Sequence, residues 1–259
     1  MNTIHSLDAV AFLKNKNSSS VDLILTDPPY EINYKDGIAR NPLKAIQNDT
    51  IGSVDWEGFF IEASRVLKDR KVVYVHCRIE MITRIFNAAQ SAGLKYAHDF
   101  VWLKGDMGYG NLNVMGTTHE MIIAFSKGNA EKSRQLNVDG VIKKRTPAVY
   151  YGKLSTKENY GHPTQKPIEL LAYIILNRTD KSDLVVDPFS GSGSTALAAS
   201  LLSRNFSCSD IDEEFVKLAQ ERLIDDEHKK IYTHISNEVL TKNLIGYKFQ
   251  TAKQSLVSF

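Results

Sequence analysis

The sequence VDLILTDPPY at residues 21–30 is the stretch from which the fold can be worked out. Residues 21–25 form a short apolar run with β-branched side chains, which is typical of a buried strand. The two prolines cannot extend this strand, because proline has no backbone N–H and a fixed φ angle. They also push Asp27 and Pro28 toward extended conformations. We therefore expect a rigid turn at the carboxyl end of a strand, where open α/β sheets bind ligands.

The groups on this turn suit methyl transfer to an exocyclic amino group of a nucleobase. Such a nitrogen is a poor nucleophile, because its lone pair is delocalised into the ring. A carboxylate and a carbonyl that accept its two N–H bonds favour the pyramidal nitrogen, and hydrogen bonds to a charged acceptor are the stronger kind. The Tyr30 ring can stack on a base swung out of the duplex. The alternative is a structural turn, in which Asp27 caps a neighbouring segment and Tyr30 packs.

Length and composition are those of an ordinary soluble globular protein. The 259 residues are enough for one large α/β domain. The net charge of +2 gives no global basic field, so any attraction for a polyanion must be local. Cys77 and Cys208 form neither a metal-ligand spacing nor a disulfide framework, which fits a reducing cytoplasm. No stretch approaches a membrane span, so we expect a cytoplasmic protein without a metal or membrane contact.

The hydrophobic pattern along the rest of the chain alternates between the periods of strands and helices. We expect further strands at 3–5, 71–75, 100–103, 121–125, 184–186 and 206–209. Helices are expected at 8–13, 56–67, 79–92, 167–178 and 213–223, and another one ends near 202. Residues 31–55 and 105–118 have loop character and are long enough to be functional.

A second turn of interest, DPFSGSGS at residues 187–194, connects a predicted strand to a predicted helix. Its glycines let the backbone approach a ligand closely. It does not match the dinucleotide fingerprint, because Ala196 stands where the third glycine belongs, and no lysine follows to cradle phosphate. Asp210 ends the next strand and can hold ribose hydroxyls. A nucleoside cofactor without an obligatory phosphate therefore fits better than NAD.

The segment 127–166 is locally basic. It contains nine Lys or Arg residues against three Asp or Glu residues, interleaved with Tyr150, Tyr151 and Tyr160. Lysine and arginine can bind phosphates and tyrosine rings can stack on bases, so nucleic-acid contact is one interpretation. The other is a solvated loop with ordinary surface lysines. The residues HPTQK at 162–166 precede a predicted apolar helix, whose N-terminus favours an anionic group.

Three motifs in this order resemble a known family, the β class of amino-group DNA methyltransferases that use S-adenosylmethionine. They are DPPY at 27–30, GHPTQKP at 161–167 and DPFSGSG at 187–193, and in this class the catalytic motif precedes the cofactor loop, as here. The resemblance spans residues 3–30 and 56–223. The chain looks most like the small MboII-type adenine methyltransferases of restriction–modification systems.

The resemblance implies an α/β, Rossmann-like methyltransferase fold: a mixed, mostly parallel seven-stranded sheet with helices on both faces. It implies a single catalytic domain over residues 1–259, with a target-recognition segment at 127–160. The expected cofactor is S-adenosyl-L-methionine and the expected substrate is double-stranded DNA. A cognate restriction endonuclease is the expected functional partner, and the family is often dimeric.

The family's roles carry over to matching residues. Asp27 and the Pro28 carbonyl would accept hydrogen bonds from the target amine, Pro29 belongs to the same motif, and Tyr30 would stack on the flipped base. The resemblance implies cofactor contacts from Asp8, Asp27, His162, Thr164, Gln165, Lys166, Asp187, Pro188, Phe189, Ser190, Gly191, Gly193, Ser194, Asp210, Ile211 and Asp212, with residues 164–166 near the methionine carboxylate. The expected DNA contacts are Lys132, Arg134, Lys143, Lys144, Arg145 and Lys153.

Other activities are weighed against adenine N6 methylation. Cytosine C5 methylation needs a cysteine nucleophile, usually after proline, and neither cysteine has that context. Cytosine N4 methylation stays open, although that activity more often has serine in place of Asp27. Protein glutamine methylation usually shows asparagine at that position and lacks the permuted order. A DNA-binding subunit without activity is the alternative of a different class, which the intact Asp27, Tyr30 and loop glycines disfavour.

Overall fold

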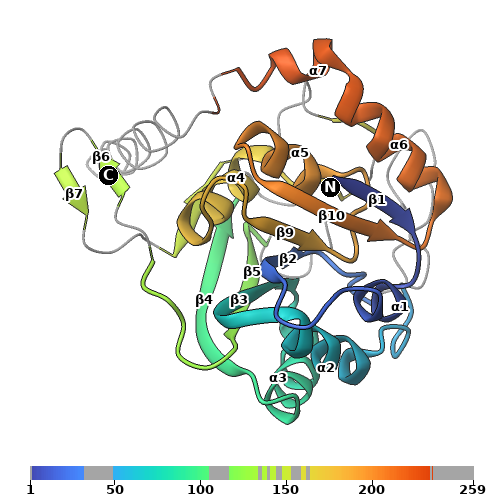
Figure 1. Cartoon of the computed structure of the whole chain (residues 1–259), viewed down its shortest axis with the longest axis vertical. Coiled ribbons are helices and arrows are strands. Elements are labelled where there is room, and N and C mark those ends of the chain that lie inside the picture. The colour runs from blue at the N-terminus through green and yellow to red at the C-terminus, as the bar shows by residue number, and fades with distance from the viewer. Residues whose placement is uncertain are drawn as a thin grey trace.

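The computed structural model describes residues 2–31, 49–104, 117–133, 136–138, 141–143, 148–152, 159–161, 164–233 and 235. In this part of the chain an eight-stranded sheet forms the centre, with the strand order β1-β10-β9-β2-β3-β5-β4-β8 (Figure 1). The strands are β1 (Thr3–Ser6), β2 (Val21–Thr26), β3 (Leu67–Cys77), β4 (Lys95–Leu103), β5 (His119–Ser126), β8 (Val149–Tyr151), β9 (Leu184–Asp187) and β10 (Asn205–Asp210). A separate two-stranded sheet pairs β6 (Leu136–Val138) with β7 (Val141–Lys143).

The sheet is mixed and mostly parallel, as predicted. Five of its seven neighbouring pairs are parallel, and only β5 runs antiparallel to both of its neighbours, β3 and β4. The expectation of seven strands is corrected to eight. The additional strand β8 comes from the basic segment and pairs in parallel with the outer edge of β4, where Trp102 aligns with Tyr150. This pairing spans about fifty residues, so it leaves no local periodicity in the sequence.

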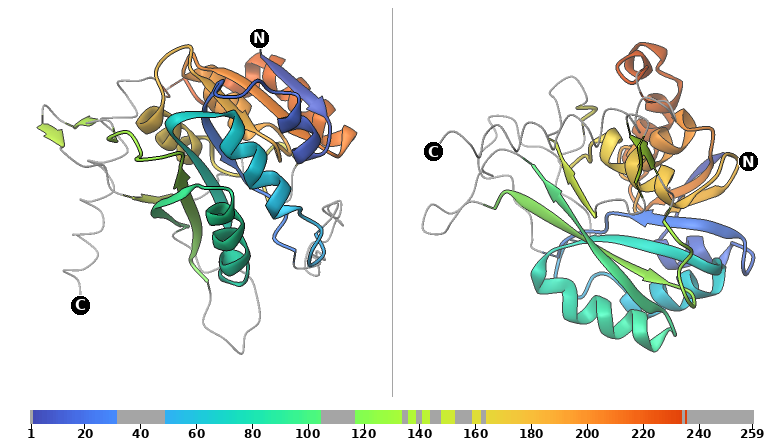
Figure 2. Two further views of the ribbon diagram at one scale, coloured as in Figure 1. Left: turned by 60° about the horizontal axis from the view of Figure 1, so that its bottom comes forward. Right: turned by 90° about the vertical axis from the view of Figure 1, so that its left-hand side faces the viewer.

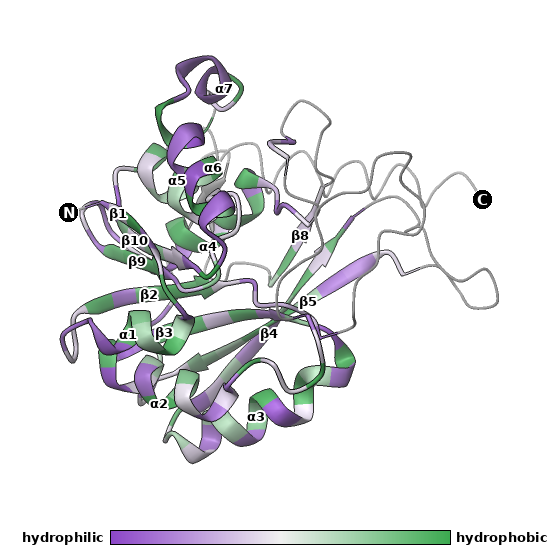
Figure 3. Cartoon of the chain, turned by 90° about the vertical axis from the view of Figure 1, so that its right-hand side faces the viewer, coloured by the Kyte–Doolittle hydropathy of each residue, from purple (hydrophilic) through white to green (hydrophobic). Residues whose placement is uncertain are grey.

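Helices cover both faces of the sheet, as Figures 2 and 3 show. The helices are α1 (Ala9–Lys14), α2 (Trp56–Val66), α3 (Ile82–Ser91), α4 (Ile168–Arg178), α5 (Ser194–Leu201), α6 (Glu213–Ile224) and α7 (Asp226–Lys230). Buried side chains of α1, α2 and α3 pack on one face with Ile24 of β2. Those of α4 and α5 pack on the other face with Leu23 and Leu25. All six residues of β2 are buried, because its apolar side chains face both layers and its two polar residues, Asp22 and Thr26, are hydrogen-bonded.

Several helix ends follow from local sequence. Asp8, Asp55 and Asp212 each accept backbone N–H bonds at the start of α1, α2 and α6. The helix expected at 79–92 is divided, because a 3₁₀ turn, η1 (Ile79–Met81), precedes α3. Arg78, at the start of η1, makes no side-chain capping bond. Gly93 follows α3 with a φ of +77°, the left-handed conformation that glycine adopts without strain.

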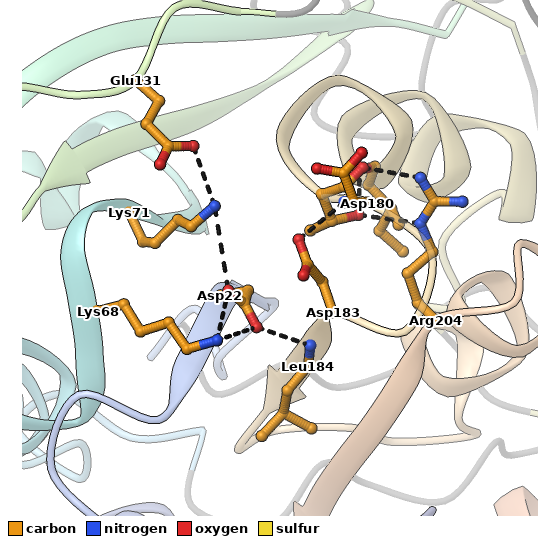
Figure 4. Close-up of polar contacts among 10 residues, drawn as sticks. Asp22, Lys68, Lys71, Glu131, Asp180, Asp183, Leu184 and Arg204 are labelled. Atoms are coloured by element: carbon orange, nitrogen blue, oxygen red, sulfur yellow. Dashed lines mark hydrogen bonds and ion pairs between the residues drawn. The ribbon is translucent and has the colours of Figure 1, made fainter.

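The amino-terminal ends of β2 and β9 are tied together by a buried carboxylate, shown in Figure 4. Asp22 accepts two hydrogen bonds from Lys68 Nζ, at 2.8 and 2.9 Å, and one from the Leu184 backbone N–H at 3.0 Å. A few residues away, Arg204 donates to the Thr179 carbonyl at 2.7 Å. The bond between Asp22 and Leu184 fixes the relative position of β2 and β9, whose other ends carry the two turns of interest.

Replacing Asp22 with alanine is expected to lower the free energy of unfolding by about 2–3 kcal/mol, because the Leu184 backbone N–H loses its acceptor and the Lys68 ammonium loses its buried carboxylate partner. Urea denaturation measures the change. Lys68→Ala is the matched control, since it removes the 44% exposed end of the same ion pair and should cost less than about 1 kcal/mol. Equal losses in both variants would contradict a role for Asp22 in joining the strands.

The described helices include none that is long and apolar enough to cross a membrane. Of the loops expected from the sequence, residues 32–48 and 105–116 lie outside the described residues, as does most of the chain after Tyr232.

Candidate active site

Two turns leave the same edge of the sheet, side by side. β2 and β9 are parallel neighbours, with Leu23 aligned to Val185 and Ile24 to Val186. The turn at 27–30 and the turn at 187–193 therefore begin next to each other. Thr26 Oγ1 donates a hydrogen bond of 2.6 Å to Asp187 Oδ1, which joins the last residues of the two strands. The expected turns at the carboxyl ends of these strands are confirmed.

A partly buried cluster of charged groups surrounds the first turn. Lys166 Nζ lies 2.6 Å from Asp27 Oδ2 and 3.3 Å from Glu120 Oε2. It also donates a hydrogen bond of 3.2 Å to the Tyr30 hydroxyl, which in turn donates to Glu120 Oε2 at 3.2 Å. Lys104 forms a further ion pair with Glu120. Two carboxylates and two ammonium groups thus meet around the tyrosine.

Burial and charge pairing fix the ionisation of this cluster. Burial alone would lower the pKa of Lys166, but the Asp27 and Glu120 carboxylates beside it raise that pKa overall. Burial alone would raise the pKa of Glu120, but Lys166 and Lys104 bring it to about 2. Burial and the two carboxylates raise the pKa of the Tyr30 hydroxyl well above its usual value. At neutral pH Lys166 and Glu120 are therefore charged, and Tyr30 keeps its proton.

One oxygen of Asp27 is left for a ligand. Its Oδ2 binds Lys166, whereas its Oδ1 is buried and has no hydrogen-bond partner among the described residues. A buried acceptor without a donor is costly, and such an atom marks a place where a bound molecule can supply the donor. An amino N–H of a substrate would meet this need.

His76 also lies at this cluster. It is fully buried on β3, and neither ring nitrogen has a hydrogen-bond partner within the described parts of the chain. Burial lowers the pKa of His76 to about 4, so the imidazole is neutral at physiological pH. The charges of Asp27, Lys166 and Glu120 also act on this pKa, so the ring lies within electrostatic range of the cluster.

The sequence interpretation missed Glu120, Lys104 and His76. None belongs to a recognisable motif, and they come from different strands or strand ends. The register of the sheet brings them together, because His76 pairs with Ile122 and Trp102 with Glu120. No signal in a single sequence gives that register.

The second turn is shaped by hydrogen bonds to its backbone. The Gly191 N–H donates to Asp210 Oδ2 at 2.8 Å, and the Asp212 N–H donates to Asp210 Oδ1 at 3.0 Å. Gly193 begins α5 with a φ of +75°, and a Cβ there would lie 2.8 Å from Ala219 Cβ of α6. Glycine at this position therefore permits both the turn and the close approach of α6.

The turn fits a nucleoside with a positively charged group. Burial raises the pKa of Asp187 to about 7 and also raises the pKa of Asp210, so both carboxyls gain from a nearby donor or cation. Each Asp210 oxygen accepts at least one backbone bond, and a carboxylate has further lone pairs that can accept from a ribose hydroxyl. The Ser190 hydroxyl is buried without a partner among the described residues and can bind a polar ligand group.

Other predicted cofactor residues have structural contacts of their own. Asp8 caps α1 by accepting from Val10 N at 2.9 Å, and Gln165 accepts from Tyr160 N at 2.8 Å. Asp212 caps α6, and the neighbouring Ile211 is exposed. The cofactor contacts of these residues and of Thr164, Pro188 and Ser194 stay predictions.

The structure places the Lys166 ammonium at the first turn, and the expected position of residues 164–166 near the methionine carboxylate stays a prediction. The ammonium binds Asp27, Glu120 and Tyr30 of the first turn and its surroundings. Among the remaining predicted residues, Lys132 is exposed and Lys143 ends the short strand β7. The others lie outside the described residues, namely His162, Arg134, Lys144, Arg145 and Lys153.

Comparison with known proteins identifies the class to which this fold and site belong. The profile of the N6/N4 DNA methylase family matches residues 21–221. The type II methyltransferase M2.DpnII of Streptococcus pneumoniae is 31% identical over 240 residues, which cover 85% of this chain and 88% of that protein. M.HpaI of Haemophilus parainfluenzae is 27% identical over 92% of this chain and 82% of its own length. The chain belongs to the N6/N4 DNA methylase family.

Solved structures share the fold. The M1.HpyAVI–SAM complex has a TM-score of 0.68 at 24% identity and covers 86% of this chain and 100% of that one. The cytosine-N4-specific PvuII DNA methyltransferase has a TM-score of 0.67 at 20% identity, with 92% of each chain covered. The Rossmann-like methyltransferase fold predicted from the sequence is thereby confirmed.

Proposed function

We propose that this protein transfers the methyl group of S-adenosyl-L-methionine to the N6 amino group of adenine in double-stranded DNA. The observation that carries the proposal is the buried Oδ1 atom of Asp27, which has no hydrogen-bond partner among the described residues and lies on a turn beside the glycine turn at 187–193. The residues of the glycine turn suit the cofactor, with Asp210 for the ribose and the Gly191–Gly193 backbone beside the nucleoside. The cofactor supplies a methyl group bound to a sulfonium sulfur, a strong electrophile.

The chain's own groups prepare the target nitrogen. Asp27 Oδ1 accepts one amino N–H and the Pro28 carbonyl accepts the other, which favours the pyramidal nitrogen and directs its lone pair toward the methyl carbon. The N–CH₃ bond forms as the S–CH₃ bond breaks, and the nitrogen then loses one proton to Asp27 or to water. The Tyr30 ring stacks on the everted base. His76 is neutral and Tyr30 protonated, so neither adds a charge to the site.

Adenine is favoured because aspartate stands first in the DPPY motif. Cytosine N4 is the second candidate, since its amino group presents the same two N–H donors and the PvuII cytosine-N4 enzyme shares the fold. The test incubates the protein with labelled S-adenosylmethionine and unmethylated genomic DNA, and the product is digested to nucleosides. N6-methyldeoxyadenosine is expected. N4-methyldeoxycytidine would overturn the choice of base, and DNA binding without transfer would support a non-catalytic subunit.

The biological setting proposed is a type II restriction–modification system of the MboII type, in which methylation protects host DNA from a cognate endonuclease. The curated relatives M2.DpnII and M2.MboI are both named type II methyltransferases, which supports this setting. A single catalytic domain and a possible homodimer complete the proposal.

The segment at 127–160 is proposed as the target-recognition region. Its hairpin of β6 and β7 lies apart from the main sheet (Figure 1), which suits a segment that reaches toward a duplex. Changing Lys143, Lys144 and Arg145 to glutamine should weaken DNA binding and reduce the slope of log K against log salt by about 3, because each lost phosphate contact removes about one. Fluorescence anisotropy at several salt concentrations measures the slope.

The matched control changes three exposed lysines that lie elsewhere, Lys95, Lys181 and Lys217. This control alters the net charge equally but should leave the slope within about one of the original value. A triple variant of the segment with the same slope as the wild-type protein would remove it from the DNA interface.

A further inference from the structure

The ammonium group of Lys166 is the centre of the first turn's polar contacts. It has three N–H bonds, and the structure gives it three partners: Asp27 at 2.6 Å, Tyr30 at 3.2 Å and Glu120 at 3.3 Å. Its side chain is only 6% exposed. All three donors therefore have acceptors within the described residues.

These partners come from three separate parts of the fold. Asp27 and Tyr30 lie on the turn after β2, and Glu120 lies on β5. Lys166 directly precedes Pro167, the N-cap residue of α4. Lys166 therefore connects the turn to the opposite half of the sheet. It also divides the Asp27 carboxylate into two unequal oxygens, since it binds Oδ2 while Oδ1 has no partner among the described residues.

We propose that Lys166 is a positioning residue that fixes the Asp27 carboxylate through Oδ2 so that Oδ1 faces the target amine, with Glu120 as its anchor. This inference rests on the proposed function. Lys166 does not touch the reacting atoms itself. A carboxylate held by one strong ion pair has a single orientation, and a reaction that depends on the direction of a nitrogen lone pair is sensitive to that orientation.

Glu120 gives this arrangement its rigidity. Its Oε2 accepts from both Lys166 and Tyr30, and Lys104 binds its other oxygen, Oε1. Within the described parts of the chain, His76 beside the pair is neutral and Lys104 forms a second ion pair with Glu120. Lys166 can therefore serve as the cation of Asp27 without leaving Glu120 unpaired.

The test compares Lys166→Met with Lys104→Met in the full-length protein. Both variants remove one ammonium from Glu120, but only the first removes the partner of Asp27. In Lys166→Met we expect kcat at saturating S-adenosylmethionine to fall roughly 10²–10³-fold, while the Kd for S-adenosylmethionine, measured by calorimetry, changes less than about threefold. In Lys104→Met the loss of kcat should stay below about tenfold.

Two further variants keep the inference testable if Lys166→Met does not fold. Lys166→Arg retains a cation that reaches the same two carboxylates, so its kcat should lie within roughly tenfold of the wild-type value. Glu120→Gln weakens the anchor and should lower kcat by about tenfold with an unchanged Kd for S-adenosylmethionine. Circular dichroism and thermal melting establish that each variant is folded.

Three results would overturn the inference. The first is a Kd for S-adenosylmethionine that rises tenfold or more in Lys166→Met while kcat is unchanged, which would place Lys166 at the cofactor. The second is an equal loss of kcat in Lys104→Met and Lys166→Met. The third is full activity in Glu120→Gln. Failure of the proposed function is seen separately, because the wild-type protein itself would then transfer no label to DNA.

Discussion

Asp27→Ala is expected to lower kcat for methyl transfer on the order of 10³-fold while leaving the Kd for S-adenosylmethionine within a few-fold of the wild-type value. The variant loses the charged acceptor that polarises the target amine, and groups of this kind contribute roughly 10²–10⁴-fold to a rate. The cofactor turn should stay in place, because it is held by Asp210 and by the Thr26–Asp187 hydrogen bond rather than by Asp27. Single-turnover label transfer and calorimetry measure the two quantities.

Asp226→Ala is the control for this prediction. Asp226 lies on α7 with its side chain 85% exposed, so the same chemical change there should leave kcat unaltered. Asp27→Asn is an informative intermediate, because the amide keeps a neutral acceptor and should recover part of the lost rate. A variant Asp27→Ala with normal turnover and weakened cofactor binding would show that the residue serves the cofactor instead of the amine.

Gly193→Ala is expected to have the second large effect, on stability and cofactor affinity together. The added methyl group would lie 2.8 Å from Ala219 Cβ and 3.3 Å from Ala219 Cα, so the start of α5 must move away from α6. The left-handed φ of +75° adds strain for any residue with a Cβ. Together these should lower the free energy of unfolding by about 2–4 kcal/mol. The displaced turn should also raise the Kd for S-adenosylmethionine by tenfold or more, which is roughly the effect of losing one well-positioned contact.

The control variant Gly93→Ala separates the effect of the contact with Ala219 from the effect of backbone strain. Gly93 has nearly the same backbone conformation, with a φ of +77°, but a Cβ there would meet nothing within 4 Å. This control should therefore cost only the backbone strain, about 1 kcal/mol, with no change in cofactor affinity. Urea denaturation of both variants gives the comparison. If Gly193→Ala lost no more stability than Gly93→Ala, the close packing of α6 against the turn would not matter.

The sequence predicted those parts of the fold whose cause is local. The apolar run at 21–25 and the proline pair after it indicate a buried strand and a rigid turn, and the structure has both. The single helix expected at 79–92 fails where η1 precedes α3, because periodicity does not register how a helix begins. The eighth strand, β8, was missed because its identity depends on a distant edge of β4.

The residues of the candidate site also fall into two groups, those that belong to motifs in the sequence and those that only strand pairing brings together. Asp27, Tyr30 and the turn glycines could be named from motifs, because the chemistry of each turn is written in consecutive residues. Glu120, Lys104 and His76 could not, since they reach Asp27 only through the pairing of three strands. Lys166 was named from its motif as a cofactor residue, which stays a prediction, and the structure places its ammonium beside Asp27 and Glu120.

The pairing of β8 with the edge of β4 suggests how the DNA sequence recognised by such proteins can differ between relatives. The chain leaves the sheet at Ser126, where β5 ends, and returns to it at Val149, where β8 begins. The returning strand is anchored by its pairing with β4 and by the hydrogen bond of 2.9 Å from Tyr150 to Glu169 of α4. Both points of attachment belong to the scaffold. On the proposed role of this segment in target recognition, we expect that the stretch between them can be exchanged between relatives, which would change the recognised DNA sequence while the turns at 27–30 and 187–193 stay the same.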